Sequence, residues 1–579
     1  MAILLSLLFK LPIMKRYSFL LASILFIFFA PRSYSQSFNR KTIEKINTKA
    51  IEKALKTSVR MWGFDTLKQQ RNSSQFSGVV VSAEGHILTA AHATIPGNTY
   101  KVFFPDGQER IAVALGRIGF KDKNNLPDVA MMKIVGKGTW PFAELGWSGS
   151  LKTNEPCLSI SYPETLDQKQ PTVRFGRIVV PLNQWGFVQS SCKMEPGDSG
   201  GPLFDYLGRV VALHSRIDLS EEVNLEVPVD LYRKYWTALN KVEDYAALPE
   251  QQDAFSKDPL AEKLISIPAL AQIDKQFEKI EPKIKGTSLM IKSRLNGIEQ
   301  QAVGTLFILN NATIKGRNPN GSYLIAKSTL VGTEPNIDSE KISAKKLTII
   351  GRDKANDLVL MQLESPLKSG IVYHSLKDTS DIKFEEIGKF LLSALPDKVS
   401  KISILSSKNM DLPRRFSAPY FGANANFINQ QIILTSITPG SPASEAKLEL
   451  KDQVTGINGI PISQPPQYGG EIMKYAPGDT ITIQGVRNGT DFNISVALKR
   501  MPVRGNHPAD RLEGGKSIRL DDFKKVFAHD AAIKADECGG PVFDAEGKFY
   551  GINIARFSRT STLTIPSNVV YKFISDTLQ

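Results

Sequence analysis

Three side chains that could together perform nucleophilic acyl transfer occur in the first half of the chain. His92 closes the run Leu-Thr-Ala-Ala-His, Asp128 opens Asp-Val-Ala, and Ser199 lies inside Glu-Pro-Gly-Asp-Ser-Gly-Gly-Pro. A serine hydroxyl is a weak nucleophile near neutral pH, so it needs a neighbouring base and a carboxylate that orients that base. The order His, Asp, Ser therefore predicts His92 as general base, Asp128 as orienting carboxylate and Ser199 as nucleophile.

Glycines surround the candidate nucleophile and permit a tight turn there. Gly197, Gly200 and Gly201 allow backbone conformations that other residues rarely adopt. In such a turn the N–H groups of Gly197 and Ser199 can point at a developing oxyanion. Each motif alone is also compatible with a core histidine, a strand-edge carboxylate or an ordinary glycine-rich turn. Their joint occurrence in this order favours the catalytic interpretation.

The elements that position these residues follow from longer runs around them, which are Ser77–His92, Asp128–Lys133 and Gly197–Pro202. With these runs, the stretch from Ser77 to about Trp236 resembles the trypsin-like protease domain of the HtrA/Deg family. The resemblance implies two six-stranded antiparallel barrels with the active site between them. Short Val- and Ile-rich runs separated by Gly, Pro and Asn turns agree with a mainly β fold.

Four residues are expected to line the primary specificity pocket, because trypsin-like folds build it from the residues before the nucleophile and from the following strand. They are Lys193, His214, Ser215 and Arg216. A cationic lining would favour an acidic substrate side chain. The alternative is that Lys193 and Arg216 point into solvent.

The protease pattern occurs a second time in the C-terminal half. The parallel runs are Val303–Asn310 with Ser77–Ser82, Gly321–Ser328 with Gly85–His92, Asn356–Met361 with Pro127–Met132, and His529–Asp544 with Ser190–Asp205. The repeat therefore spans both halves of a barrel pair.

The catalytic positions differ in this second copy. Ser328 is expected at the base position, Asp357 retains the carboxylate, and Cys538 replaces the nucleophilic serine. Asp536 and Glu537 beside the thiol would raise its pKa and disfavour the reactive thiolate. The copy is predicted to be catalytically inactive, and a redox or cysteine-nucleophile role is the alternative.

A different pattern interrupts the second copy. The runs Pro419–Ala423, Ile437–Ala446, Leu448–Asp452 and Ile457–Pro461 resemble a PDZ domain of the HtrA type. The resemblance implies a carboxylate-binding loop, which captures a peptide C-terminus through its backbone amides and consists of Tyr420, Phe421, Gly422 and Ala423. The alternative is a degenerate module that only spaces its neighbours. The corresponding place in the first copy is the short connection Pro181–Gly186.

The N-terminus has the pattern of a secretory signal peptide over residues 1–35. A basic Met14-Lys-Arg precedes an apolar run from Phe19 to Ala30, which is short for a membrane span. Met14 is an alternative start. We expect export to a bacterial periplasm or outside the cell, without a membrane-spanning segment.

Composition argues against nucleic acid as a partner and leaves open whether two cysteines form a disulfide. The formal net charge is +14, but Lys and Arg are spread along the chain beside acidic residues, so nucleic-acid binding is not expected. No metal or cofactor pattern is present. Cys157 and Cys192 could be bridged or could remain two buried thiols.

The expected fold is mainly β, with two trypsin-like double-barrel domains, the second degenerate, and an inserted PDZ-like domain. The expected parts are a signal peptide (1–35), an N-terminal helix (36–62), the active protease domain (63–245), a linker with helical segments (246–285), the degenerate domain (286–409 and 502–579) and the PDZ-like domain (410–501).

These expectations describe an exported HtrA-type serine endopeptidase that cleaves unfolded or damaged proteins in protein quality control. The PDZ-like domain would bind peptide C-termini, and the inactive copy would regulate; a homo-oligomer is compatible with the sequence. The rival interpretation is a non-proteolytic chaperone or peptide-binding sensor with a latent triad. The intact first copy favours the protease.

Overall fold

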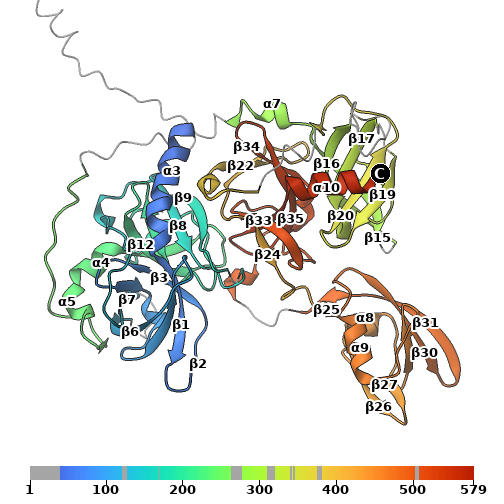
Figure 1. Cartoon of the computed structure of the whole chain (residues 1–579), viewed down its shortest axis with the longest axis horizontal. Helices are drawn as coiled ribbons and strands as arrows, with labels where there is room; N and C mark the ends of the chain where they lie inside the picture. Colours follow the sequence, from blue (N-terminus) through green and yellow to red (C-terminus); the bar gives the residue numbers. More distant parts are fainter. Residues whose placement is uncertain are drawn as a thin grey trace, which may run out of the picture. The chain divides into compact units, whose positions relative to one another are not determined.

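The computed structural model (Figure 1) describes residues 40–119, 127–166, 168–261, 277–295, 297–309, 320–339, 342, 346–373, 381–502 and 507–578. The expected signal peptide, residues 1–35, lies outside the described residues. Among the described residues, no helix combines the length and the apolar composition that crossing a bilayer requires.

The first barrel is an antiparallel sheet in which β6 pairs with both β5 and β7. Its strand order is β6-β5-β1-β3-β4-β7, and short strands β2 and β14 add to β1 and β6. Alternate residues of these strands are apolar and buried, as a barrel interior requires. The strands are β1 (Ser58–Asp65), β2 (Gln70–Arg71), β3 (Phe76–Val80), β4 (His86–Thr89), β5 (Thr99–Phe103), β6 (Glu109–Ile118), β7 (Val129–Ile134) and β14 (Asp244–Tyr245).

The second barrel is closed, with the order β10-β13-β12-β11-β8-β9. The short helices α4 (Val229–Lys234) and α5 (Trp236–Leu239) follow it. Its strands are β8 (Pro156–Ser161), β9 (Thr172–Val180), β10 (Val188–Ser190), β11 (Pro202–Asp205), β12 (Val210–Ile217) and β13 (Asn224–Pro228). The mainly β architecture with trypsin-like barrels is confirmed.

Residues 286–409 and 502–579, called the C-terminal region below, repeat the order of the first barrel. Its first sheet runs β18-β15-β16-β17-β20-β19, which matches β5-β1-β3-β4-β7-β6 strand for strand. The strands are β15 (Ser288–Leu295), β16 (Ile298–Leu309), β17 (Gly321–Lys327), β18 (Thr333–Ile337), β19 (Leu347–Asp353), β20 (Leu358–Leu363) and β21 (Ile371–Val372), after helix α7 (Glu281–Ile284).

The second sheet of this region runs β23-β22-β34-β35-β36-β33-β24. This order matches that of the closed barrel of the first copy, read as β9-β8-β11-β12-β13-β10 and back to β9. The single strand β9, which closes that barrel, is replaced here by two separate strands, β23 and β24. The elements are β22 (Phe390–Ser393), β23 (Lys401–Ile404), β24 (Met410–Leu412), β33 (Phe523–His529), β34 (Pro541–Asp544), β35 (Phe549–Arg556), β36 (Thr562–Pro566) and helix α10 (Ser567–Thr577).

A separate set of strands enters the chain between β24 and β33. They form the sheet β26-β27-β28-β30-β31, with β29 paired to β28, and the two-stranded pair β25-β32. The elements are β25 (Pro419–Tyr420), β26 (Ala423–Ile428), β27 (Gln431–Ile437), α8 (Pro442–Glu445), β28 (Gln453–Ile457), β29 (Ile460–Pro461), α9 (Pro465–Ile472), β30 (Thr480–Arg487), β31 (Thr490–Ala497) and β32 (Lys499–Arg500). In the first copy, only a turn joins the matching strands β9 and β10.

The N-terminal helix is shorter than expected. Helix α3 (Arg40–Ala54) buries Ile43, Ala50 and Ile51, in agreement with its apolar spacing. The expected helix over 36–62 was nevertheless too long, because β1 begins at Ser58 and residues 58–62 pair with β3 and β5.

Candidate active site

His92 and Asp128 meet at the end of the first barrel. His92 is the middle residue of the 3₁₀ turn η2 (Ala91–Ala93) after β4, and Asp128 immediately precedes β7, which pairs with β4. Nδ1 of His92 lies 2.7 Å from Oδ2 of Asp128, and the His92 N–H donates to Oδ1 at 2.9 Å. Ser215 donates its hydroxyl to the same Oδ2 at 2.7 Å. The carboxylate therefore orients the ring and leaves Nε2 for the nucleophile.

The electrostatics of this pair suit a general base. Partial burial lowers the pKa of His92, but the hydrogen bond and the charge of Asp128 outweigh it and raise the pKa above its ordinary value. Burial raises the pKa of Asp128, and the contacts with His92 and Ser215 bring it below the usual range. Asp128 is therefore ionised near neutral pH and strengthens His92 as a proton acceptor.

The rate of hydrolysis is expected to fall as the pH is lowered through the pKa of His92, because only the neutral imidazole accepts the Ser199 proton. Since Asp128 raises this pKa, the midpoint of kcat/KM for an uncharged peptide should lie above about 6.5, the ordinary value for histidine. The measurement is a pH profile of kcat/KM, with the labelling rate of a neutral fluorophosphonate as control. A midpoint below that value would contradict the observed contact.

The backbone around Ser199 is arranged to receive an oxyanion. Gly197 has φ of 98°, and a Cβ there would lie 2.3 Å from the Glu164 N atom, so only glycine fits. The Glu164 N–H donates to the Pro196 carbonyl at 2.9 Å. Because the C=O and N–H of a trans peptide point in opposite directions, this bond turns the Gly197 N–H the other way. Among the described residues, neither the Gly197 nor the Ser199 N–H has a backbone acceptor.

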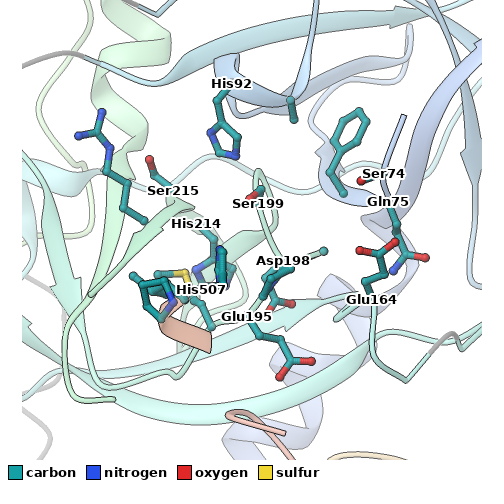
Figure 2. Close-up of a pocket in the computed structure, with 18 of the residues that line it drawn as sticks. Ser74, Gln75, His92, Glu164, Glu195, Asp198, Ser199, His214, Ser215 and His507 are labelled. Atoms are coloured by element: carbon teal, nitrogen blue, oxygen red, sulfur yellow. Dashed lines mark hydrogen bonds between the residues drawn. The ribbon is translucent and has the colours of Figure 1, made fainter. Parts of the chain in front are cut away.

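Figure 2 shows the His92 ring directed toward Ser199. Both residues line a cavity of about 660 Å³. Ser77 of β3 secures the other side of the nucleophile loop, since its N–H donates to the Ser199 carbonyl at 2.9 Å and its hydroxyl to the Gly197 carbonyl at 2.7 Å. His92, Gly197 and Ser199 therefore line the same cavity.

A buried ion pair that the sequence analysis missed braces the same loop. Arg174 and Asp198 are each 1% exposed and form a two-pronged contact, with N–O distances of 2.7 and 2.8 Å. Arg174 also donates to the Lys193 carbonyl at 2.8 Å, and Ser161 donates to Asp198 at 2.8 Å. Burial raises the pKa of Asp198, and Arg174 brings it below its usual range. An arginine inside the apolar run of β9 was the available signal.

The residues expected in the specificity pocket have different surroundings. His214, Ser215 and Arg216 line the cavity. Ser215 is committed to Asp128, as described above, and Nε2 of His214 lies 2.6 Å from the Ser159 hydroxyl. Arg216 lies over the Phe187 ring, at 5.1 Å from its centre.

Lys193 contributes no free cation to the cavity. It is not among the described residues that line it, and its ammonium group lies 2.7 Å from Glu221, with the side chain 16% exposed. A second acid, Glu226, lies 3.7 Å from Nδ1 of His214, and burial raises its pKa to about 6. The expectation of a cationic lining through Lys193 was wrong, because its charge is neutralised inside the protein by Glu221. The alternative, that Lys193 and Arg216 point into solvent, also fails for Lys193, whereas Arg216 is exposed.

Comparisons with known proteins agree with this geometry. The trypsin-like peptidase domain family matches residues 76–213, and the PDZ domain family matches residues 419–498. The chain therefore contains a trypsin-like peptidase domain and a PDZ domain.

Curated relatives match part of this chain. A probable periplasmic serine endoprotease, DegP-like, of Ectopseudomonas mendocina is 33% identical over 153 residues, which are 26% of this chain and 31% of the relative. Serine protease HTRA1 of Xenopus tropicalis is 29% identical over 217 residues, or 36% of this chain and 44% of the relative. The chain therefore spans less than half the length of these relatives.

A solved serine endoprotease from Yersinia pestis is similar over 79% of this chain and 98% of its own, with 15% sequence identity and a TM-score of 0.28.

The C-terminal region repeats the carboxylate but lacks the histidine. The Thr329 N–H donates to Oδ1 of Asp357 at 2.8 Å, as the His92 N–H does to Asp128. Thr329 therefore occupies the base position, and the prediction of Ser328 was one residue too early. Lys327 lies 2.6 Å from Oδ2 of Asp357, with both side chains 1% exposed.

Cys538 lies at the nucleophile position as a buried thiol. Burial raises its pKa, while Lys327 and Ser517 lower it in part. The sequence analysis named Asp536 and Glu537 as the cause, but the Glu537 carboxylate lies 3.0 Å from both Lys398 and Lys401. His529 lies 2.7 Å from Asn553, and burial lowers its pKa to about 4. The thiol therefore has no base partner in these contacts.

Cys157 and Cys192 lie close together inside the second barrel. Their Sγ atoms are 3.8 Å apart, and both thiols are free and buried. Of the two alternatives left open by the sequence, the structure has two buried thiols.

The expected peptide-binding loop of the PDZ domain lies between α9 and the start of β26. The carbonyl of Phe421 accepts from Ala443 at 3.0 Å, and Gly422 has φ of 82°. Tyr468 of α9 donates its hydroxyl to the Ala423 carbonyl at 3.0 Å. Tyr420 pairs with β32. These contacts fix the loop against the helix that forms the other side of a PDZ groove.

Proposed function

We propose that this chain is an HtrA-type serine endopeptidase that hydrolyses peptide bonds through an acyl-enzyme at Ser199. The observation that supports the proposal is the His92–Asp128 contact beside a nucleophile loop that lines the same cavity and whose Gly197 and Ser199 N–H groups have no backbone acceptor among the described residues. This arrangement favours catalysis over a chaperone or sensor with a latent triad.

The residues act in two half-reactions. His92 removes the Ser199 proton as the hydroxyl oxygen attacks the peptide carbonyl, and the Gly197 and Ser199 amides bind the oxyanion. His92 then donates the proton to the leaving amine, and Asp128 stabilises the imidazolium. Water, deprotonated by His92, releases the acyl group and regenerates the hydroxyl.

The setting of this activity belongs to the same proposal. Unfolded or damaged proteins in a bacterial periplasm are the proposed substrates, and the PDZ domain is proposed to bind their C-termini. The C-terminal region is proposed to be an inactive regulator, because Thr329 and the buried Cys538 replace the base and the nucleophile.

Ser199→Ala is expected to abolish labelling of the full chain by a fluorophosphonate and cleavage of an unfolded protein, since it removes the proposed nucleophile from the cavity that His92 lines. Cys538→Ser is the matched control and should label and cleave like the unchanged chain. If Ser199→Ala retained the activity, Ser199 would not be the nucleophile. If the unchanged chain reacted in neither assay, with or without C-terminal peptides, the sensor interpretation would replace the protease.

A further inference from the structure

The nucleophile loop is held partly by residues far along the chain. Glu195, four positions before Ser199, is 4% exposed. Its carboxylate accepts a hydrogen bond from Thr165 of the protease domain. Thr560 of the C-terminal region donates to it through the hydroxyl at 3.1 Å and through the N–H at 3.4 Å. Both hydrogen bonds from Thr560 therefore come from outside the protease domain.

Thr560 lies in the turn between β35 and β36, residues 556–561, called the docking hairpin below. In the matched strand order, β35 and β36 correspond to β12 and β13. The docking hairpin meets the turn between β12 and β13, residues 218–223, so equivalent hairpins of the two regions contact each other. Arg559 makes this contact through the carbonyls of Asp218 at 3.0 Å, Ser220 at 2.7 Å and Val223 at 3.4 Å.

A second acid, Glu221, extends the same contact to Lys193. Glu221 binds the Lys193 ammonium at 2.7 Å, the Arg556 guanidinium at 3.0 Å and the Glu513 N–H at 2.8 Å. Arg556 and Arg559 are 1% and 0% exposed. Burial of two cations is unfavourable unless acceptors are positioned for them, so these bonds specify one arrangement of the hairpin.

The position of Glu195 controls the turn that carries the oxyanion amide. The Glu195 N–H donates to Asp198 Oδ2 at 2.9 Å, and the Asp198 N–H donates to the Glu195 carbonyl at 3.1 Å. Gly197 lies between these two residues. A displacement of Glu195 therefore tilts the Gly197 peptide relative to Ser199. Burial and the charge of Asp198 raise the pKa of Glu195, while the hydroxyls of Ser558 and Thr165 lower it in part.

We propose that Thr560 and Arg559 are positioning residues for hydrolysis at Ser199, because they hold the nucleophile loop and the adjoining 218–223 turn in the productive geometry. The inference rests on the proposed function and assigns the inactive C-terminal region a direct part in it. His507 and Pro508 of the same region also line the catalytic cavity (Figure 2).

The test compares Thr560→Val with Thr562→Val in the full chain. Both changes remove one buried hydroxyl from the same part of the chain. The Thr560 hydroxyl donates to Glu195 of the protease domain, whereas the Thr562 hydroxyl donates to the Ala531 carbonyl at 2.7 Å, within the C-terminal region. Thr560→Val is expected to lower kcat and the rate of fluorophosphonate labelling about tenfold or more, because a misplaced oxyanion donor is costly. KM should change less than twofold, and Thr562→Val should keep both rates within twofold.

Two further variants separate positioning from folding. Thr560→Ser restores the donor and should recover the rates, whereas a merely structural loss should lower the melting temperature of both valine variants alike. Arg559→Gln, which leaves the 218–223 carbonyls short of donors, should also lower kcat.

The outcomes are distinct. If the unchanged chain labels at Ser199 and Thr560→Val labels as fast as Thr562→Val, the inference is overturned while the proposed function stands. If Thr560→Val fails to fold, equal kcat in Arg559→Gln and the unchanged chain overturns the inference. If the unchanged chain never labels, both fail.

Discussion

Asp128→Asn is expected to lower kcat for peptide hydrolysis about 10⁴-fold, with a small change in KM. The Oδ2 atom that it alters binds Nδ1 of His92 at 2.7 Å and the Ser215 hydroxyl at 2.7 Å. An amide NH₂ at that place would donate a hydrogen bond to Nδ1. It would therefore favour the tautomer in which Nδ1 is unprotonated and Nε2 carries the proton. That tautomer cannot accept the Ser199 proton. Steady-state kinetics on a peptide substrate provide the measurement.

Asp357→Asn in the C-terminal region is the matched control for this variant. It leaves the buried Lys327 ammonium without its carboxylate, so it should lower the melting temperature. It should leave kcat within severalfold at a temperature well below unfolding. A comparable loss of kcat in both variants would mean that the two carboxylates do not have separate roles.

Arg174→Met is expected to lower both stability and activity. Removal of one partner from a buried ion pair costs about 3 to 5 kcal/mol, because the other charge stays buried without compensation. Asp198 would retain the Ser161 hydroxyl and the Glu195 N–H but lose both guanidinium bonds. The turn that carries Gly197 would lose its brace, and we expect kcat to fall by about 10² or more.

The pH dependence of this variant follows from the depressed pKa of Asp198. The stabilisation by the ion pair is present above the pKa of Asp in the unfolded chain, about 3.9, and is lost as the pH falls through the lower folded value. In Arg174→Met the unpaired Asp198 carboxyl protonates readily. The difference in the free energy of unfolding between the unchanged chain and this variant should therefore shrink as the pH is lowered toward about 4. Denaturant unfolding at several pH values measures it.

Arg177→Met controls for the loss of an arginine from the same strand, since Arg177 is exposed. It should change the free energy of unfolding by less than about 0.5 kcal/mol. The double variant Arg174→Met with Asp198→Asn should recover part of the stability, because it removes the orphaned charge. A double variant less stable than Arg174→Met would refute this account.

The sequence predicted those parts of the molecule that depend on short-range chemistry. His92, Asp128 and Ser199 could be assigned because each stands in a motif whose neighbours are needed for its geometry, such as the glycine at φ of 98° before the nucleophile. The repeat could be found because the runs around the candidate catalytic positions recur in the same order, and the PDZ domain because runs such as Pro419–Ala423 resemble that family.

The assignments that failed depend on atoms brought together from distant parts of the chain. Ser328 and Thr329 are adjacent hydroxyl residues, and only the bond from the Thr329 N–H to Asp357 decides which one has the place of His92. Likewise, the charge of Lys193 appeared available to a substrate until the structure placed Glu221 beside it.

The sequence by itself determined the mainly β fold, the trypsin-like and PDZ domains and the residue types at the candidate site. Only the tertiary structure decided how that site is braced, through Arg174 on Asp198 and Thr560 on Glu195. The physical reason is that a motif encodes local backbone geometry, whereas the partner of a buried charge is set by packing between strands. The bond between Glu195 and Thr560 spans 365 positions, and no local pattern signals it.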